Sequence, residues 1–125
     1  MVIGTGIDVV EIERVSHSIE RYGSRFLERV YTAGEIAYCQ RKRRNAAESF
    51  AARFAAKEAG AKALGTGIGF GVTWRELEVG REPAGRPLLL HGRAAEIAAS
   101  LGVRRSSLSI THTRTQSMAL VILED

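Results

Sequence analysis

The sequence is poor in cysteine, proline and histidine: its 125 residues include one, two and three of them. A single cysteine, Cys39, excludes an intramolecular disulfide framework. The histidines, His17, His91 and His112, form no HExxH pair, and one cysteine forms no CxxC pair, which argues against a structural zinc site. The low cysteine content fits a reducing compartment, so we expect a cytoplasmic protein.

Long hydrophobic runs are also missing. The longest uncharged stretch, residues 63–74, is short and rich in glycine, so no membrane span is expected. The first residues lack the basic and apolar regions of a signal peptide. We find no repeat, linker or low-complexity segment. With 45% hydrophobic and 26% charged residues, the composition predicts a single globular domain over residues 1–125.

Charge favours anionic partners. Eighteen Lys and Arg residues against fourteen Asp and Glu give a net charge of +4. The basic run Arg41–Arg44 is typical of a phosphate or nucleic-acid patch, although it lacks the interleaved aromatic residues of single-strand binders. One hypothesis is therefore a non-enzymatic basic module that binds nucleic acid, and the alternative is an enzyme.

Apolar spacing predicts an α+β fold, with helices packed on a small, largely antiparallel sheet. We expect a strand over residues 2–10 and a helix over residues 11–22. Thr32 and Glu35 have capping-box spacing, and Gly65 suits the C-terminal cap of the longest helix. The remaining expected elements are a short helix capped by Ser24, a long helix over residues 46–64, a helix over residues 94–101, and strands near residues 77–79, 88–90, 108–110 and 118–123.

Two glycines precede an acidic residue in the first strand. Alternation places Gly4, Gly6 and Asp8 on one face. Val9 replaces the third glycine of a dinucleotide-binding fingerprint, so that function is excluded. Either the glycines leave room for a ligand beside Asp8, or they allow another element to pack against the strand with Asp8 solvated.

Glu58 lies at the edge of the apolar stripe of the long helix, one turn after Phe54 and one turn before Lys62. It either pairs with Lys62 on the surface or has a function of its own. The glycines at 65, 67, 69 and 71 follow this helix rather than precede one, which excludes a P-loop.

Two further features each allow a structural and a functional interpretation. His112 shares its strand face with Leu108 and Ile110, so it is either a satisfied structural residue or an anion contact. Arg14 and Arg21 lie within about 20° of each other on a helix, away from its apolar stripe. Their face, which Arg25 extends, is either solvated or a dock for an acidic helix.

Three segments together resemble the bacterial holo-acyl-carrier-protein synthases, a small trimeric group of 4′-phosphopantetheinyl transferases. The family's opening pattern, G-x-G-x-D-[IV]-x-E-[IL], appears as residues 4–12. Its core pattern, R-[FW]-A-A-K-E-A-x-x-K-A-x-G-T-G, appears as residues 53–67, and its S-[IL]-T-H pattern as residues 109–112. Each segment alone is weakly specific, but a coincidence of all three in this order is improbable. The resemblance extends over essentially the whole chain.

The resemblance implies an enzyme that moves the phosphopantetheine arm of coenzyme A onto a serine of an apo-acyl carrier protein for fatty acid biosynthesis. It implies Mg²⁺ as the metal, with Asp8 and Glu58 as the ligand positions. Hard cations prefer such carboxylate oxygens. We expect Glu58, directly or through water, to act as the base, and Lys62 to offset charge on the leaving bisphosphate.

The resemblance also implies the remaining contacts. The residues expected to bind the coenzyme are Arg53, Gly65, Thr66, Gly67, His112 and Thr113, with Arg44 as a further candidate. Arg14, Arg21 and Arg25 are expected to meet the acidic helix of the carrier protein. In the family the active sites lie between subunits of a homotrimer, and neither nucleic acid nor membrane is an expected partner. Carrier proteins of a different pathway, such as polyketide synthesis, remain an alternative substrate.

Overall fold

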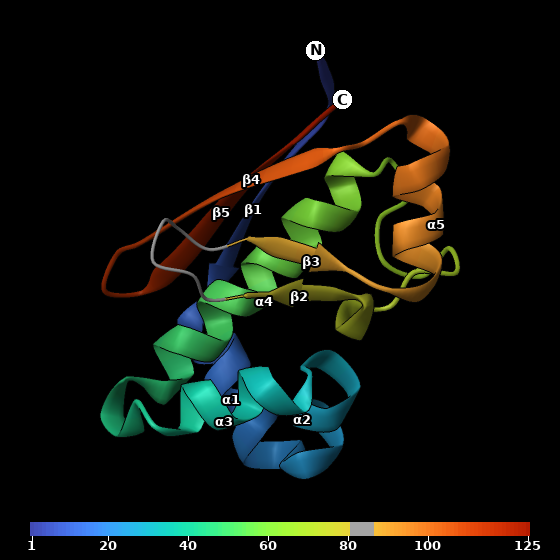
Figure 1. The fold of residues 1–125 in the computed structure, drawn as a ribbon. Coiled ribbons are helices and arrows are strands. Elements are labelled where there is room, and N and C mark those ends of the chain that lie inside the picture. The colour runs from blue at the N-terminus through green and yellow to red at the C-terminus, as the bar shows by residue number, and fades with distance from the viewer. Residues whose placement is uncertain (81–86) are drawn as a thin grey trace.

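The computed structural model describes residues 1–80 and 87–125. A three-stranded antiparallel sheet, in the order β1 (Val2–Glu11), β5 (Gln116–Glu124) and β4 (Arg105–His112), packs on the long helix α4 (Ala46–Ala63). Figure 1 shows the sheet running along α4, with the two chain termini beside each other at one end of the strands. The α+β class and the antiparallel sheet are therefore confirmed.

Glycines in β1 allow this close packing. A methyl group on Gly4 would collide with the carbonyl oxygen of Ala63, and one on Gly6 with that of Ala59. The two glycines therefore bring the backbone of α4 against the strand, as the second interpretation predicted. Its expectation of a solvated Asp8 is wrong, because that side chain is only 17% exposed and pairs with Lys62. This packing places Asp8, at the next position on that face, beside the C-terminal half of α4.

The other helices cover the first half of α4. Helices α1 (Ile12–Tyr22), α2 (Ser24–Val30) and α3 (Ala33–Gln40) form a second core with it, separate from the core under the sheet. The cap of α2 was predicted wrongly: Gly23, with φ +57°, is its N-cap, and no side chain caps the helix. A glycine can adopt this backbone conformation and make the tight turn between α1 and α2.

The rest of the chain forms a smaller layer. After the turn η1 (Arg43–Asn45) and α4 come the turn η2 (Trp74–Glu76), the hairpin strands β2 (Leu77–Val79) and β3 (Leu88–Leu90), and α5 (Gly92–Leu101). In the described parts of the chain, no helix is both long and apolar enough to cross a membrane.

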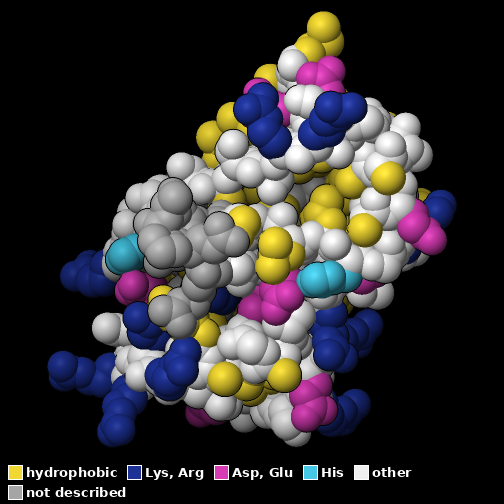
Figure 2. Space-filling model, in the orientation of Figure 1, with side chains coloured by type: hydrophobic (Ala, Val, Ile, Leu, Met, Phe, Trp, Pro, Cys, Tyr) yellow, Lys and Arg dark blue, Asp and Glu magenta, His cyan; other side chains and the backbone are white. Residues whose placement is uncertain are grey.

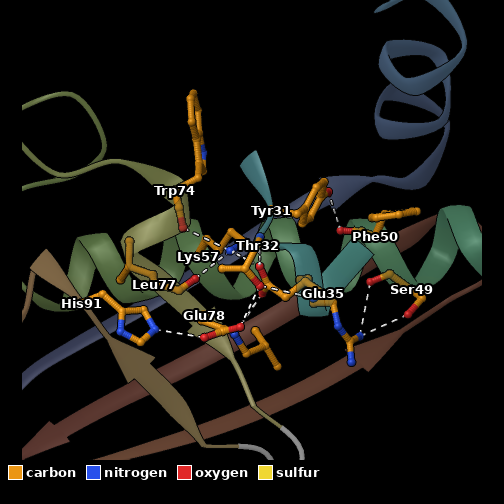
Figure 3. Close-up of polar contacts among 12 residues, drawn as sticks. Tyr31, Thr32, Glu35, Ser49, Phe50, Lys57, Trp74, Leu77, Glu78 and His91 are labelled. Carbon is orange, nitrogen blue, oxygen red and sulfur yellow. Dashed lines mark hydrogen bonds and ion pairs between the residues drawn. The ribbon is translucent and has the colours of Figure 1, made fainter. Parts of the chain in front are cut away.

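A buried ion pair joins these layers. Lys57 Nζ lies 2.6 Å from Glu35 Oε1, and both side chains are almost fully buried. The predicted capping box is confirmed, and Glu35 uses it to hold Thr32 while accepting a hydrogen bond from the backbone of Val79 at 2.9 Å. Burial lowers the pKa of Lys57, whereas the Glu35 carboxylate acts in the opposite direction. Figure 3 shows this cluster linking α3, α4 and β2.

Candidate active site

Asp8, Glu58 and Lys62 come together where β1 meets α4. Lys62 Nζ donates to Asp8 Oδ1 and to the carbonyl oxygen of Ile7, each at 3.0 Å. The Asp8 side chain is 17% exposed and that of Lys62 is 52% exposed. Lys62 therefore pairs with the strand carboxylate, and the alternative of a Glu58–Lys62 pair along the helix is wrong.

Glu58 has a different partner, which sequence spacing did not identify. Its Oε1 accepts a hydrogen bond from the indole Nε1 of Trp74 at 3.2 Å. Trp74 opens η2, and the neighbouring Thr73 and Glu76 form a capping box that fixes this turn. The Thr73-x-x-Glu76 spacing was a visible signal for the turn, but not for the contact of its tryptophan with Glu58.

A cavity of about 440 Å³ lies in front of the two carboxylates. Asp8 and Glu58 line it from one side, and Arg14 lines it from α1. Phe26 and Phe54 supply apolar wall. With Glu11, three acidic residues line the cavity against one arginine, so it suits a cation, and its apolar wall suits an uncharged arm.

The donor set fits a hard cation with open positions. Among the described residues, no group of three or more His, Cys, Asp or Glu side chains forms a closed metal cage. Asp8 and Glu58 nevertheless line one cavity. Mg²⁺ is usually held by one or two carboxylates together with water and substrate phosphate, rather than by an all-protein cage. Two carboxylates with room for a ligand match that requirement.

Arg53 lies apart from these carboxylates, and its side chain is buried. Its Nη1 donates to Ser49 Oγ at 3.2 Å, and its guanidinium lies 4.3 Å from the centre of the Tyr38 ring. Its Nε and Nη2 have no hydrogen-bond partner among the described residues. Buried N–H groups without an acceptor are rare in native proteins.

His112 and Thr113 lie at the start of α4, and not in the cavity. His112 has the predicted face of β4, but its side chain is 51% exposed and contacts Glu48 Oε1 at 3.2 Å. Its contact with α4 confirms the predicted inner side of the sheet, and the side chain is half exposed because the strand ends at this residue. Thr113 Oγ1 accepts hydrogen bonds from the backbone of Thr115 and Gln116, which stabilises the turn to β5.

Gly65 and Thr66 follow the other end of α4. Gly65 has φ +85°, as expected of a C-terminal helix cap, and the hydroxyl of Thr66 bonds the Gly67 carbonyl at 2.9 Å. An 18-residue helix is about 27 Å long. Gly65 and Thr66 therefore lie at the opposite end of α4 from His112, which contacts Glu48, and Arg53 lies in the middle of the helix.

The three predicted docking arginines are exposed around the cavity. Arg14 lines it, and Arg25 lines a neighbouring hollow together with Arg29. The Arg21 guanidinium lies 5.5 Å from the Tyr22 ring centre. Figure 2 shows Lys and Arg side chains projecting on both sides of the helical half of the molecule.

Known proteins match this chain in both sequence and fold. Residues 4–120 match the model of the 4′-phosphopantetheinyl transferase superfamily. The holo-[acyl-carrier-protein] synthase of Koribacter versatilis is 60% identical over the full length of both chains.

Solved structures agree. The holo-[acyl-carrier-protein] synthase of Neisseria meningitidis has a TM-score of 0.88 at 31% identity, with both chains fully covered. That of Helicobacter pylori, solved with coenzyme A, has a TM-score of 0.83 at 30% identity, covering 96% of this chain and 99% of its own. The chain therefore belongs to the 4′-phosphopantetheinyl transferase superfamily, among the holo-[acyl-carrier-protein] synthases, and it is an enzyme.

Proposed function

We propose that this enzyme transfers 4′-phosphopantetheine from coenzyme A to a serine hydroxyl of an apo-acyl carrier protein and releases adenosine 3′,5′-bisphosphate. Asp8 and Glu58 line one cavity, and Lys62 forms an ion pair with Asp8; this arrangement carries the proposal. Relatives named for the same activity, and a related structure that holds coenzyme A, support it. The product carrier would serve fatty acid biosynthesis.

Asp8 and Glu58 would hold Mg²⁺, which fits their chemistry and their shared cavity. When bound, the ion supplies charge neutralisation at the pyrophosphate oxygens. The proposed reaction also requires a base for the serine hydroxyl, and a carboxylate at the cavity can supply it. We assign Glu58 the role of base, acting directly or through a water molecule, because Lys62 does not occupy it.

Lys62 would stabilise the departing bisphosphate. Its ammonium group is half exposed and lies beside Asp8, so it can reach a phosphate oxygen at the cavity without a change in the backbone. A cation held at the place where negative charge develops lowers the barrier of phosphoryl transfer. The enzyme needs to form no covalent bond to the substrate in such a reaction. Most of the rate comes from the positioning of the reactants and from charge stabilisation of the transition state.

The coenzyme would span two subunits. Gly65, Thr66 and Gly67 follow the C-terminal end of α4, whereas His112 and Thr113 lie at its first turn and Arg53 in its middle. A homotrimer solves this separation when one subunit supplies the first group and its neighbour the second. The unpartnered Nε and Nη2 of Arg53 would then meet the 3′-phosphate of the coenzyme.

The outer face of the sheet supports such an assembly. Ile7, Val9 and Leu120 are 62%, 50% and 38% exposed, and Ile7 lies directly opposite Leu120 in the strand register. Adjacent exposed apolar side chains of this kind are typical of a protein interface. Light scattering should give three times the mass of the chain, and Ile7→Glu should reduce it to that of a single chain.

The carrier protein would bind beside the cavity through Arg14, Arg21 and Arg25. These side chains are exposed on α1 and α2, and Arg14 also lines the cavity. An acidic helix that docks there would be attracted by charge and would deliver its serine next to Glu58.

Release of adenosine 3′,5′-bisphosphate tests the proposal. With coenzyme A, Mg²⁺ and an apo carrier, chromatography should show one bisphosphate for each carrier consumed. Omission of the carrier, or replacement of Glu58 by Gln, should abolish release. Bisphosphate formed equally well without a carrier would identify a hydrolase and overturn the transfer reaction.

A further inference from the structure

We propose that Trp74 is a positioning residue whose indole N–H holds the Glu58 carboxylate in its working orientation. This inference rests on the role proposed for Glu58 above. Trp74 Nε1 donates to Glu58 Oε1 at 3.2 Å. An indole can only donate, and a carboxylate accepts several hydrogen bonds, so the contact leaves Oε2 and further lone pairs available for a cation or a proton.

Trp74 is held at its backbone by the residue next to Glu58. Lys57 Nζ donates to the Trp74 carbonyl at 3.1 Å and to the Leu77 carbonyl at 2.7 Å. With Glu35 as third acceptor, the three protons of the ammonium group are all used. Figure 3 shows the Trp74 carbonyl facing Lys57 while the indole ring points away from the buried pair.

The ring is also held from the side. Phe54, one turn before Glu58, packs against it with ring centres 6.1 Å apart. The Arg29 guanidinium lies 5.9 Å from its centre. The backbone and the ring of Trp74 are therefore both fixed, and a fixed donor restricts a long acidic side chain to fewer orientations.

A tryptophan with only a structural role would make most of these contacts, but its hydrogen bond to Glu58 would not affect the rate of the reaction. Removal of packing lowers stability and leaves the rate of the remaining folded enzyme unchanged. Removal of the N–H alone should leave the fold intact and loosen the carboxylate that the reaction uses. Partners that orient a metal-binding side chain typically affect metal affinity or activity by about 10–100-fold.

Trp74→Phe separates the two cases because it keeps an aromatic ring for packing and removes the N–H donor together with part of the indole. We expect kcat to fall roughly tenfold or more, with KM for the carrier protein within about twofold of wild type. Mn²⁺ affinity, followed by the electron paramagnetic resonance of the free ion, should weaken by a similar factor. Tyr31→Phe is the matched control, because it also removes one hydrogen-bond donor from an aromatic ring, but that donor bonds the Phe50 carbonyl and not Glu58, and it should keep wild-type kcat.

The unmodified chain provides a second readout, because Trp74 is its only tryptophan. Titration with Mn²⁺ should quench its fluorescence with the same Kd that the electron paramagnetic resonance measurement gives. Asp8→Asn should abolish the quenching. Wild-type kcat and Mn²⁺ affinity in Trp74→Phe, or no quenching in wild type, would overturn the inference while leaving the transfer reaction intact. Full activity in Glu58→Gln would instead overturn the proposed role of Glu58, and this inference with it.

Discussion

Lys62 and Asp8 form an ion pair at 3.0 Å across 54 residues of sequence, at the edge of a cavity. The Lys62 side chain is half exposed, so solvent screens the attraction and the pair contributes less than about 1 kcal/mol to stability. The pair thus keeps a positive charge beside two carboxylates without being required for the fold.

Replacement of Lys62 by Met should consequently separate stability from catalysis. We expect the free energy of unfolding, from urea titration, to change by less than about 1 kcal/mol. Transfer should slow by a factor on the order of 10²–10³, as for loss of one group that stabilises a transition state. Lys62→Arg, which keeps the charge, should retain more activity. A Lys62→Met enzyme that transfers at the wild-type rate would exclude the assigned role.

Lys57 should show the opposite behaviour. Its ammonium and the Glu35 carboxylate are buried together, so Lys57→Met leaves an unpaired buried charge. Loss of one partner of such a pair costs about 3–5 kcal/mol, which urea titration would measure. The double variant Lys57→Met/Glu35→Gln should recover part of that loss. A loss below about 1 kcal/mol in the single variant would contradict the pair's structural role.

Local patterns predicted most helices and strands because neighbours in sequence determine them. The capping box of Thr32 and Glu35, the cap at Gly65 and the long helix all depend on residues within one or two turns. The cap of α2 was wrong because serine is also tolerated inside a first turn, whereas the φ of Gly23 decided the boundary.

The contacts of the site were harder to predict, because they join segments that are distant in sequence. The spacing of Glu58 and Lys62 along one helix suggested a pair, but the glycines of β1 bring Asp8 closer to Lys62. No spacing rule connects Trp74 to Glu58 across the loop after α4. The assignment of Asp8 and Glu58 to one site came from family resemblance, and the structure places both at one cavity.

Glu76 should make stability depend on pH. Its carboxylate is partly buried, which raises its pKa, but hydrogen bonds from the backbone N–H groups of Thr73, Arg93 and Ala94 outweigh this and lower the pKa below its ordinary value of 4.5. The Glu76 carboxyl therefore binds a proton more readily in the unfolded chain. Its contribution to the free energy of unfolding is complete above about pH 4.5 and is lost as the pH falls.

Glu76→Gln measures that contribution. At pH 7 it should lower the free energy of unfolding by about 0.5–1 kcal/mol, since the carboxylate caps the start of α5. The difference from wild type should shrink as the pH falls below about 4.5. A difference that stayed constant down to pH 3 would show that the charge of Glu76 is not involved.

Arg14 should affect the carrier protein more than the coenzyme. It is exposed on α1 at the cavity, so Arg14→Glu would place a negative charge where an acidic helix docks. We expect KM for the carrier to rise about tenfold or more, with the Kd for coenzyme A unchanged. Arg104→Glu, with the same change in net charge at the opposite end of the sheet from α1, is the control. Equal losses for both ligands would show that the arginines do not form a separate dock.

The mass of the carrier protein tests the central claim most directly. After incubation with the enzyme, coenzyme A and Mg²⁺, an apo-acyl carrier protein should gain about 340 Da, the mass of one phosphopantetheine group. The gain should vanish with EDTA, with Glu58→Gln, and when the acceptor serine of the carrier is replaced by alanine. An unchanged mass across several apo carriers, with a folded enzyme that binds coenzyme A, would contradict the transfer reaction proposed here.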